Sequence, residues 1–256
     1  MRSFYSFRSV SSSFLRNFWT QQIMLRKEDV ASMRIDYKTE GFSEDDLVAK
    51  EPMKQFDVWF NMARESKDIQ EANAMVLSTC GSDGQPSART VLMKNYDDQG
   101  FTFFTNLTST KGKQLMENPK ACLLFYWPPL HRQVIIKGTA EKVSDEEATE
   151  YFHSRPRGSQ IGACISRQST VIPSREIFSE REKVLKERYA DESIPIPKPD
   201  YWGGFLIRPQ SIEFWNGQTS RLHNRIRFRK LIPDEEIDSK LAKLGSNGWV
   251  YEMLSP

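Results

Sequence analysis

The chain has 256 residues, with 36 Lys and Arg against 34 Asp and Glu, and its formal net charge is +2. This length is enough to bury a large core, whereas the near-neutral charge argues against a protein that coats nucleic acid through a general basic excess. No apolar stretch approaches the roughly 20 residues that a helix needs to cross a bilayer.

The N-terminal segment differs in composition from the rest of the chain. Residues 1–32 are rich in Ser and aromatic residues, and all charged residues before Glu28 are basic. This composition is typical of a mitochondrial transit peptide, and a disordered basic leader without a targeting role fits it equally well. Cys80, Cys122 and Cys164 form no C-x-x-C pair, which indicates reduced thiols in an intracellular protein, cytoplasmic or mitochondrial.

From Glu51 onward the pattern becomes globular. Pro52 suits the first turn of a helix, in which Phe56, Trp59 and Phe60 recur at helical spacing. Hydrophobic runs bounded by turn residues then predict strands, with one helix from Ser109 to about Asn118 between the third and the fourth. The expected strands are Ala74–Cys80, Ser87–Asn95, Phe101–Asn106, Ala121–Trp127 and Arg132–Val143.

The C-terminal half adds two helices and more strands. Ser144 and Glu147 form a capping box that opens a helix, which Pro156 must end. A charged helix is expected from Ser174 to about Tyr189, and residues 234–248 have the composition of a polar surface loop. Many short strands joined by tight turns predict an α+β, mainly antiparallel barrel with helices inserted between sets of strands. The last expected strands are GGFLIRP, SIEFWNG, RLHNRIRFRK and WVYEML.

Two segments carry basic residues in a setting that suits a phosphate. In the expected strand 87–95, Arg89 and Lys94 lie on opposite faces of an apolar strand, although charged ends that reach solvent would give the same pattern. In NLTSTKGKQ, Thr110 and Lys111 lie at an expected helix start, where backbone N–H groups bind anions. A plain N-cap with solvated lysines is the alternative for the second segment.

A third segment, EYFHSRPRGSQ, suggests a second phosphate site. Tyr151 and Arg155 are four residues apart on one helix face, and a turn at Gly158-Ser159 would bring a hydroxyl back towards them. Arg, Tyr and Ser side chains together can hold a phosphate. A Tyr packed beneath the Arg stem is the alternative. His153 is expected at the surface, away from this face.

The segment FWNGQTSRLHNRIRFRK contains no acidic residue. In an extended chain Arg221, His223 and Arg225 would share one side, next to Trp215. Such a set suits a flat, electron-poor or anionic ring, because Trp stacks on it and Arg supplies planar donors. The alternatives are a solvated edge strand protected by charge and a strand that binds RNA, and the low net charge argues against RNA.

Eleven stretches, taken in order, resemble the pyridoxine (pyridoxamine) 5'-phosphate oxidase family. They are MRIDY, PMKQFDVWF, EANAMVLST, GQPSARTVLMK, FFTN, STKGKQL, FYWPPLHRQVIIKG, YFHSRPRGSQIGA, SRQSTVI, WGGFLIRPQSIEFWNGQTSRLHNR and WVYEMLSP. The resemblance implies an FMN-binding split β-barrel with peripheral helices. It also implies a mobile N-terminal segment, 33–50, after the leader 1–32, and a single oxidase domain, 51–256.

The same resemblance implies an activity and its partners. FMN would be the cofactor for oxidation of pyridoxine 5'-phosphate or pyridoxamine 5'-phosphate by O2, giving pyridoxal 5'-phosphate, hydrogen peroxide and, from the amine, ammonia. The family works as a homodimer with FMN at the subunit interface, in the synthesis and salvage of vitamin B6. No metal site is expected, and neither a nucleic acid nor a membrane is expected as a partner.

Site residues follow from the resemblance by position. Arg221 is expected to orient the substrate, because a guanidinium stays protonated, and His223 is expected to handle the proton at C4'. The implied FMN contacts are Arg89, Thr90, Val91, Leu92, Phe104, Thr105, Thr110, Lys111, Gln133, Gln168, Ser169, Trp215 and Arg225. The implied substrate contacts are Lys94, Tyr151, Arg155 and Ser159 at the phosphate, Arg221, Leu222 and His223 at the ring, and Arg34 and Tyr37 from the mobile segment.

Two positions depart from the family pattern. Thr110 stands where a basic residue is common, and an uncompensated loss of that contact would weaken FMN binding by about 1–3 kcal/mol. Asn224 replaces the usual Asp of R-L-H-D-R, which removes a carboxylate that could balance Arg221 or Arg225. Three other interpretations remain: a flavin or haem-degrading split-barrel relative with another substrate, a non-catalytic pyridoxal phosphate carrier, and an RNA-binding barrel.

Overall fold

A computed structural model describes residues 30, 32, 33, 35–37 and 39–256 of the chain. It divides into two units, Met1–Tyr37 and Lys38–Pro256, and the elements below belong to the second. The predicted division at residues 32 and 50 stays a prediction. Within the described part, no helix is both long enough and apolar enough to span a bilayer.

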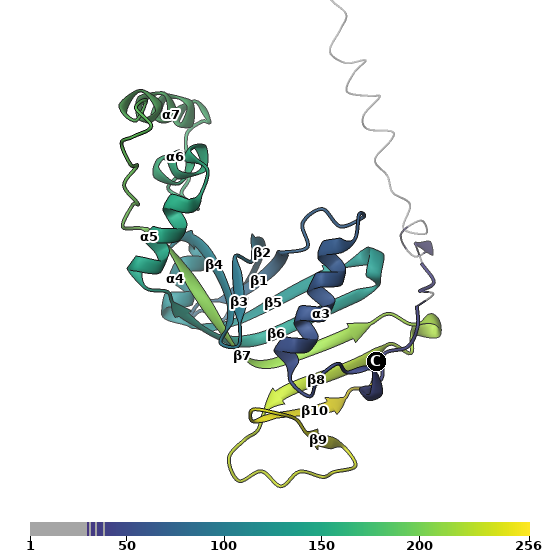
Figure 1. Ribbon diagram of the computed structural model, residues 1–256. Coiled ribbons are helices and arrows are strands. Elements are labelled where there is room, and N and C mark those ends of the chain that lie inside the picture. The colour runs from purple at the N-terminus through teal and green to yellow at the C-terminus, as the bar shows by residue number, and fades with distance from the viewer. Residues whose placement is uncertain (1–29, 31, 34, 38) are drawn as a thin grey trace, which may run out of the picture. The chain divides into compact units, whose positions relative to one another are not determined.

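A ten-stranded sheet, in which every pairing is antiparallel, forms the body of the second unit (Figure 1). Its strands follow the order β2-β1-β5-β6-β7-β8-β10-β9, and β4 pairs with both β3 and β7. The strands are β1 (Ala74–Cys80), β2 (Pro86–Leu92), β3 (Asn95–Asp97), β4 (Gly100–Asn106), β5 (Lys120–Trp127), β6 (Arg132–Lys142), β7 (Trp202–Asn216), β8 (Asn224–Lys230), β9 (Ala242–Leu244) and β10 (Trp249–Met253).

Strand β7 organises this sheet. It pairs with β6 on one side, while on the other side its first half pairs with β4 and its second half with β8. One long strand thus divides the sheet between two sets of neighbours, and hydrogen bonds among the described strands do not close it into a full cylinder. The predicted α+β, mainly antiparallel class is confirmed.

Helix α3 (Pro52–Glu65) lies across the sheet, as Figure 1 shows, and buries the aromatic residues that predicted it. Phe56 is fully buried, with its ring 4.8 Å from that of Phe101, and the Trp59 ring is 5.2 Å from that of Phe214. The other helices are α4 (Thr110–Glu117), α5 (Asp145–Ser154), α6 (Arg157–Ile165) and α7 (Glu176–Arg188), with 3-10 helices η1 (Glu44–Asp46), η2 (Pro128–Leu130) and η3 (Thr219–Arg221).

A second, smaller core attaches α5 and α6 to the start of β7. Phe152 from α5 and Ile161 from α6 are buried in it together with Trp202, the first residue of β7. The Phe152 and Trp202 rings meet edge to face, with centroids 5.1 Å apart. This packing matters for the site below, because both helices and Trp202 contribute to its wall.

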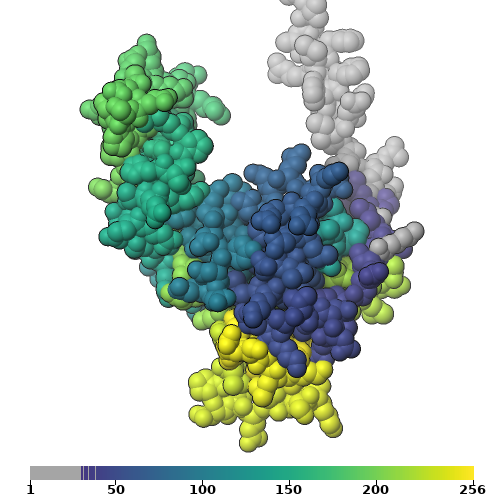
Figure 2. Space-filling view, in the orientation of Figure 1, coloured from purple at the N-terminus to yellow at the C-terminus, as the bar shows by residue number. Residues whose placement is uncertain are grey.

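The segment before α3 lies against the C-terminal strands. Lys243 forms an ion pair with Glu44, and the backbone N–H of Ser246 donates to the carbonyl of Lys50 over 2.7 Å. Figure 2 shows this contact between the purple-blue and yellow surfaces. The prediction that residues 234–248 form a polar surface loop was wrong in part, because Ala242–Leu244 form strand β9.

Other predicted elements also differ from the structure. The expected strand 87–95 ends at Leu92, and the expected turn at Gly158-Ser159 is part of helix α6. The two strands expected in 203–217 are one continuous strand, β7.

The prediction that residues 221–230 form one extended basic strand was wrong at its beginning. Ser220 and Arg221 have φ of 57° and 63°, which lie in the left-handed region, and β8 begins only at Asn224. Arg221 and His223 therefore belong to the β7–β8 connection and do not share one side of an extended chain with Arg225.

Candidate functional site

A cavity of about 960 Å³ lies between β2, β4 and the start of α4 on one side and α5, α6 and the start of β7 on the other. This volume is at the upper end of the range for small-molecule sites. Among the described residues, four cations line it and no Asp or Glu does. The lining residues are Arg89, Thr90, Val91, Leu92, Lys94, Phe104, Thr105, Asn106, Thr110, Lys111, Tyr151, Arg155, Pro156, Ser159, Gly162, Ala163, Ser166, Gln168, Ser169 and Trp202.

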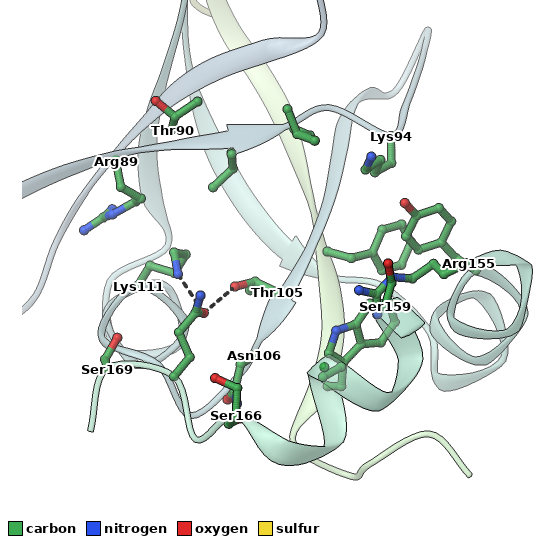
Figure 3. A pocket seen from close by; sticks show the side chains of 18 of the residues that line it. Arg89, Thr90, Lys94, Thr105, Asn106, Lys111, Arg155, Ser159, Ser166 and Ser169 are labelled. Atoms are coloured by element: carbon green, nitrogen blue, oxygen red, sulfur yellow. Dashed lines mark hydrogen bonds between the residues drawn. The ribbon is translucent and has the colours of Figure 1, made fainter. Parts of the chain in front are cut away.

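Lys111, at the N-terminus of α4, forms one end of the cavity (Figure 3). Its side chain is only 7% exposed, and its Nζ donates to Gln168 Oε1 over 3.0 Å. Burial, and then the charge of Arg89, lower the pKa of Lys111. Gln168 Oε1 also accepts from the Thr105 hydroxyl at 3.3 Å, so that α4, β4 and the segment after α6 meet at one amide group.

Arg89 lies at the same end and is held by neutral acceptors. Its Nη1 donates to the carbonyl of Leu77 over 3.2 Å and to the Thr79 hydroxyl, and burial lowers the pKa of Arg89. Among the described residues, no carboxylate forms an ion pair with Arg89 or Lys111. Two close, half-desolvated cations without an acidic partner are an arrangement that a bound dianion would stabilise.

Arg155 forms the other end of the cavity, where it follows the last turn of α5. Its guanidinium lies 4.9 Å from the ring centroid of Trp202 and 5.8 Å from that of Phe152. Its Nη1 is buried and has no hydrogen-bond partner among the described residues, and burial lowers the pKa of Arg155. A buried donor of this kind costs about 1–3 kcal/mol, or more when charged, unless a ligand accepts its hydrogen bond.

Lys94 and Ser159 complete this end, and Figure 3 shows both on the same side of the cavity as Arg155. Tyr151 also lines it, with its ring stacked on Phe104 at a centroid distance of 4.1 Å. The Tyr151 ring packs on Phe104 of β4, and the Arg155 guanidinium lies 4.9 Å from the ring centroid of Trp202.

A second group lies outside this cavity and consists of Gln133, Trp215, Arg221, Leu222, His223 and Arg225. Gln133, Trp215 and Arg225 are side-by-side partners on β6, β7 and β8. The His223 ring lies 4.8 Å from the Trp215 ring, and Leu222 next to it is 72% exposed. Arg221 belongs to the same connection, and none of this group lines the cavity.

Strand β7 keeps the two groups apart. Trp202 at its start lines the cavity and Trp215 near its end belongs to the second group, 13 positions further along. At roughly 3.3 Å per residue, the strand separates them by up to about 40 Å. A single chain therefore holds the two groups at opposite ends of one strand.

The hydrogen bonding of His223 fixes its tautomer. The backbone N–H of Gln218 donates to His223 Nδ1 over 3.0 Å, so the neutral ring carries its proton on Nε2. Burial, and then the charge of Arg221, lower the pKa of His223, which favours this neutral form. The ring is thus a donor at Nε2, and its Nδ1 is already used as an acceptor.

Comparison with known proteins places the chain in a family. Residues 62–181 match the family model described as pyridoxamine 5'-phosphate oxidase, and residues 202–256 match the C-terminal dimerisation region of pyridoxine 5'-phosphate oxidase. Pyridoxine-5'-phosphate oxidase of Bos taurus is 50% identical over 231 residues, which cover 89% of this chain and 88% of that protein. The chain belongs to the pyridoxine/pyridoxamine 5'-phosphate oxidase family.

Solved structures agree with this assignment. The chain is similar to PhzG from Burkholderia lata 383, solved with tetrahydrophenazine-1-carboxylic acid, with a TM-score of 0.72 and 26% identity over 87% of this chain and all of that one. An FMN-binding, pyridoxamine 5'-phosphate oxidase-related protein from Nostoc punctiforme PCC 73102 has a TM-score of 0.58 at 15% identity, over 79% of this chain and 96% of that one. The predicted split-barrel fold is confirmed.

The family is FMN-dependent, and the cavity fits that cofactor. FMN requires a dianion site and room for a ring system, and the Arg89–Lys111 end offers two cations without carboxylates beside a large cavity. Backbone N–H groups at the start of α4 add to the attraction for a phosphate.

One departure from the family pattern has a structural answer. Arg225 Nε donates to Glu213 Oε1 over 2.7 Å, so that Glu213 on the neighbouring strand balances Arg225 although position 224 is not Asp. Asn224 Oδ1 instead accepts from the backbone N–H of Phe42 over 3.0 Å.

Some cavity residues were not predicted from the sequence. Asn106 and Ser166 flank predicted contacts, and the Asn106 side chain donates to the Ser166 carbonyl over 3.3 Å. Trp202 could have been found as the aromatic residue before the Gly203-Gly204 pair. Of the predicted residues, Arg34 lies outside the described part of the chain, and Tyr37 belongs to the first unit. The additional lining residues are Asn106, Pro156, Gly162, Ala163, Ser166 and Trp202.

Proposed function

We propose that this chain oxidises pyridoxine 5'-phosphate and pyridoxamine 5'-phosphate to pyridoxal 5'-phosphate, with FMN as cofactor and O2 as electron acceptor. The observation that carries the proposal is the cavity with cations at both ends and no acid between them. One end suits the FMN phosphate, and the other suits the phosphate of the substrate. Relatives such as the Bos taurus protein are named for this activity.

Each end has a distinct set of groups. Arg89, Lys111 and the start of α4 hold the FMN phosphate, with Gln168 keeping the Lys111 ammonium in place. Lys94, Arg155, Tyr151 and Ser159 hold the substrate phosphate, and the buried Nη1 of Arg155 gains the acceptor that it lacks within the described chain. Phosphate binding at both ends aligns the two ring systems for reaction.

The second group acts on the rings. Arg221 places a permanent positive charge near the substrate ring, and the neutral His223 donates from Nε2 to the oxygen or nitrogen at C4'. Trp215, Gln133 and Arg225 border the flavin. When bound, FMN would supply the redox chemistry: it would take a hydride from C4' while the hydroxyl or amine proton leaves to solvent, and O2 would reoxidise it with release of hydrogen peroxide. The chain itself supplies binding, orientation and charge.

Since up to about 40 Å of β7 separates the two groups within one chain, the active site requires two chains. We infer a homodimer in which the cavity of one subunit is completed by the second group of its partner, with FMN between them. The match of residues 202–256 to a dimerisation region supports this arrangement, since Trp215, Arg221, His223 and Arg225 all lie within it. An isologous dimer would contain two such sites.

Mixed dimers test the shared site. Arg155→Ala removes a cavity residue and Arg221→Ala removes a residue of the second group, so each variant alone should have little activity at substrate concentrations well below KM. In a mixed dimer one site carries both changes and the other carries neither. If subunits pair at random, coexpression should restore about one quarter of wild-type activity. No recovery would show that each site is built within one chain.

The activity has its own test. Purified protein should show a flavin absorption band at about 450 nm, and pyridoxine 5'-phosphate added without O2 should bleach this band. Readmission of O2 should restore the band and yield pyridoxal 5'-phosphate and hydrogen peroxide in equal amounts. A protein that binds pyridoxal 5'-phosphate but has no flavin would be a carrier, and a flavin that is not bleached would indicate another substrate.

The N-terminal segment has a proposed role that the activity does not test. We propose that residues 1–32 direct the chain to mitochondria, because they are basic, rich in Ser and free of acid before Glu28. A fluorescent fusion of the full chain should enter mitochondria, and the same fusion without residues 1–32 should remain in the cytoplasm. Identical distribution of both fusions would leave the segment without a targeting role.

A further inference from the structure

A short N-terminal segment is tied to the loop that carries His223. Residues 39–42, called the strap below, are hydrogen-bonded by the carboxamides of Asn216, Gln218 and Asn224. These three residues lie at the end of β7, in the β7–β8 connection and at the start of β8. The strap therefore spans the base of the connection.

The strap has a fixed position of its own. Phe42 is only 5% exposed, and its ring lies 4.9 Å from that of Trp59 in the main core. Its backbone N–H donates to Asn224 Oδ1 over 3.0 Å. Thr39 and Glu40 are thus held beside the connection by the packing of Phe42 against Trp59, which does not involve the connection.

Thr39 is the main polar contact of the strap. Its Oγ1 donates to the carbonyl of Gly217, and it accepts from Gln218 Nε2 at 3.0 Å and from Asn216 Nδ2 at 3.4 Å. The carbonyl of Glu40 accepts from the same two amides, at 2.9 Å from Gln218 and 3.1 Å from Asn216.

Gln218 connects this strap to His223. Its side chain donates twice to the strap, while its backbone N–H donates to His223 Nδ1 over 3.0 Å. Fixing the Gln218 side chain therefore also fixes the backbone N–H that sets the tautomer of His223.

The rest of the connection offers little to hold it. Ser220 and Arg221 have positive φ, a conformation that costs free energy in residues with side chains, and residues 219–222 are exposed. A loop with few buried apolar contacts opens easily unless polar contacts restrain it. The bonds from Gln218 to the strap are such restraints.

We propose that Gln218 is a positioning residue, which transmits the position of the strap through its backbone N–H to His223 and so keeps the His223 ring oriented towards the substrate. The expected effect on kinetics rests on the proposed function, whereas the expected effect on the orientation of His223 does not. The strap is then part of the active-site architecture although none of its residues lines the cavity.

The test compares substitutions on both sides of the contact. Gln218→Ala removes the donors to the strap but keeps the backbone N–H, and Thr39→Val removes the hydroxyl at nearly constant volume. Thr39→Ser retains the hydroxyl and serves as the rescue variant. Gln210→Ala, at an exposed glutamine of strand β7, is the matched control.

The first measurement follows the ring nitrogens of His223 by ¹⁵N NMR in the FMN-loaded protein, with the signals assigned through His223→Gln. In Gln218→Ala and Thr39→Val we expect a smaller fraction of the Nε2–H tautomer and a higher pKa of His223. Arg221 is the charged group acting on this ring, and it is unchanged in both variants. Thr39→Ser and Gln210→Ala should give wild-type signals.

The second measurement is steady-state kinetics with pyridoxine 5'-phosphate. For Gln218→Ala we expect kcat/KM to fall roughly threefold to tenfold, the change expected for losing one neutral hydrogen bond, with FMN content unchanged. The double variant Thr39→Val, Gln218→Ala should lose less than the sum of the two single losses, because both changes break the Gln218–Thr39 bond.

Unchanged His223 signals in Gln218→Ala, or additive losses in the double variant, would overturn the inference. A wild-type protein that does not oxidise the substrate would refute the proposed function instead. The NMR comparison would still decide whether the strap positions His223, so that the two failures can be told apart.

Discussion

Lys111 and Gln168 are 57 positions apart in the sequence, yet Lys111 Nζ donates a 3.0 Å hydrogen bond to Gln168 Oε1. The amide oxygen is a neutral acceptor, so the bond orients the ammonium group without cancelling its charge. The segment after α6 thus keeps the buried Lys111 ammonium group oriented for an anion at the start of α4.

Replacement of Lys111 tests this end of the cavity. We expect Lys111→Met to weaken FMN binding by about 1.5–3 kcal/mol, or roughly 10- to 100-fold, because one charged hydrogen bond to the phosphate is lost. Titration of the apoprotein with FMN, followed by quenching of flavin fluorescence, measures the change. Lys113→Met, two residues further along α4 and exposed, is the control and should bind FMN normally. Equal affinities of both variants would remove Lys111 from the site.

Arg155 should show opposite effects on substrate binding and on stability. In Arg155→Met the substrate phosphate loses a charged donor, and we expect KM to rise roughly 10- to 100-fold. The same change removes a buried guanidinium whose Nη1 has no partner among the described residues, so Tm should stay the same or increase. Kinetics and calorimetry measure the two quantities.

A neighbouring arginine gives the contrast. Arg157 Nη2 donates to the carbonyls of Tyr189, Asp191 and Ile194, so Arg157→Met should lower Tm, since three carbonyls lose their donor. A loss of stability in Arg155→Met as large as that in Arg157→Met would mean that Arg155 is mainly structural.

The lowered pKa of His223 predicts that the free energy of unfolding depends on pH. Its folded-state pKa lies below the ordinary value of 6.5, so the neutral, donating ring persists as the pH falls to 6.5 and somewhat below. Because the unfolded chain binds the proton first, this group lowers the free energy of unfolding as the pH falls below 6.5, until the folded pKa is reached. Arg221→Gln removes the repelling charge, and NMR titration should show a higher pKa for His223. A pKa unchanged by this substitution would show that burial alone lowers the pKa of His223 and that the charge of Arg221 does not contribute.

Thr110 gives a gain-of-function test. Thr110 is exposed at the first position of α4, so a cation there would be partly screened. We expect Thr110→Arg to tighten FMN binding roughly twofold to fivefold at low salt, and less at high salt. The free energy of unfolding of the apoprotein should fall by about 0.3–1 kcal/mol, because a cation opposes the helix dipole. Unchanged FMN affinity at low salt would show that position 110 is too far from the phosphate.

Much of the fold follows from local patterns. The α3 helix was predicted from Pro52 and the spacing of Phe56, Trp59 and Phe60, and all of them are buried as expected. Strand β7 was predicted as two strands, GGFLIRP and SIEFWNG, with Gln210 between them. The structure accommodates it with a shift in the pairing register between Lys137 and Gly138 on β6, which no local pattern shows.

Helix α6 was missed for a physical reason. Its sequence contains Gly158 and Gly162 and follows Pro156, so its intrinsic helix propensity is low. Tertiary contacts stabilise it: Ile161 is buried in the second core, and the Gln160 side chain donates to the Arg155 carbonyl over 2.8 Å.

Most of the residues that line the cavity were named from the resemblance, whereas Asn106 and Trp202 were not. The resemblance supplied both groups of residues, whereas only the structure separates them along β7. The connection at residues 219–223 was predicted as extended, because positive φ at Ser220 and Arg221 cannot be predicted from residues that disfavour it.

The length of β7 has a consequence for how this chain can diverge. In the proposed dimer, Trp202 lies in one half of the shared site and Trp215 in the other, so the number of residues in β7 sets how far each subunit extends across the interface. Surface loops can gain or lose residues without touching that measure. A single insertion between the two tryptophans would turn every later side chain to the opposite face of the sheet, so indels there should be the least tolerated of any in the barrel.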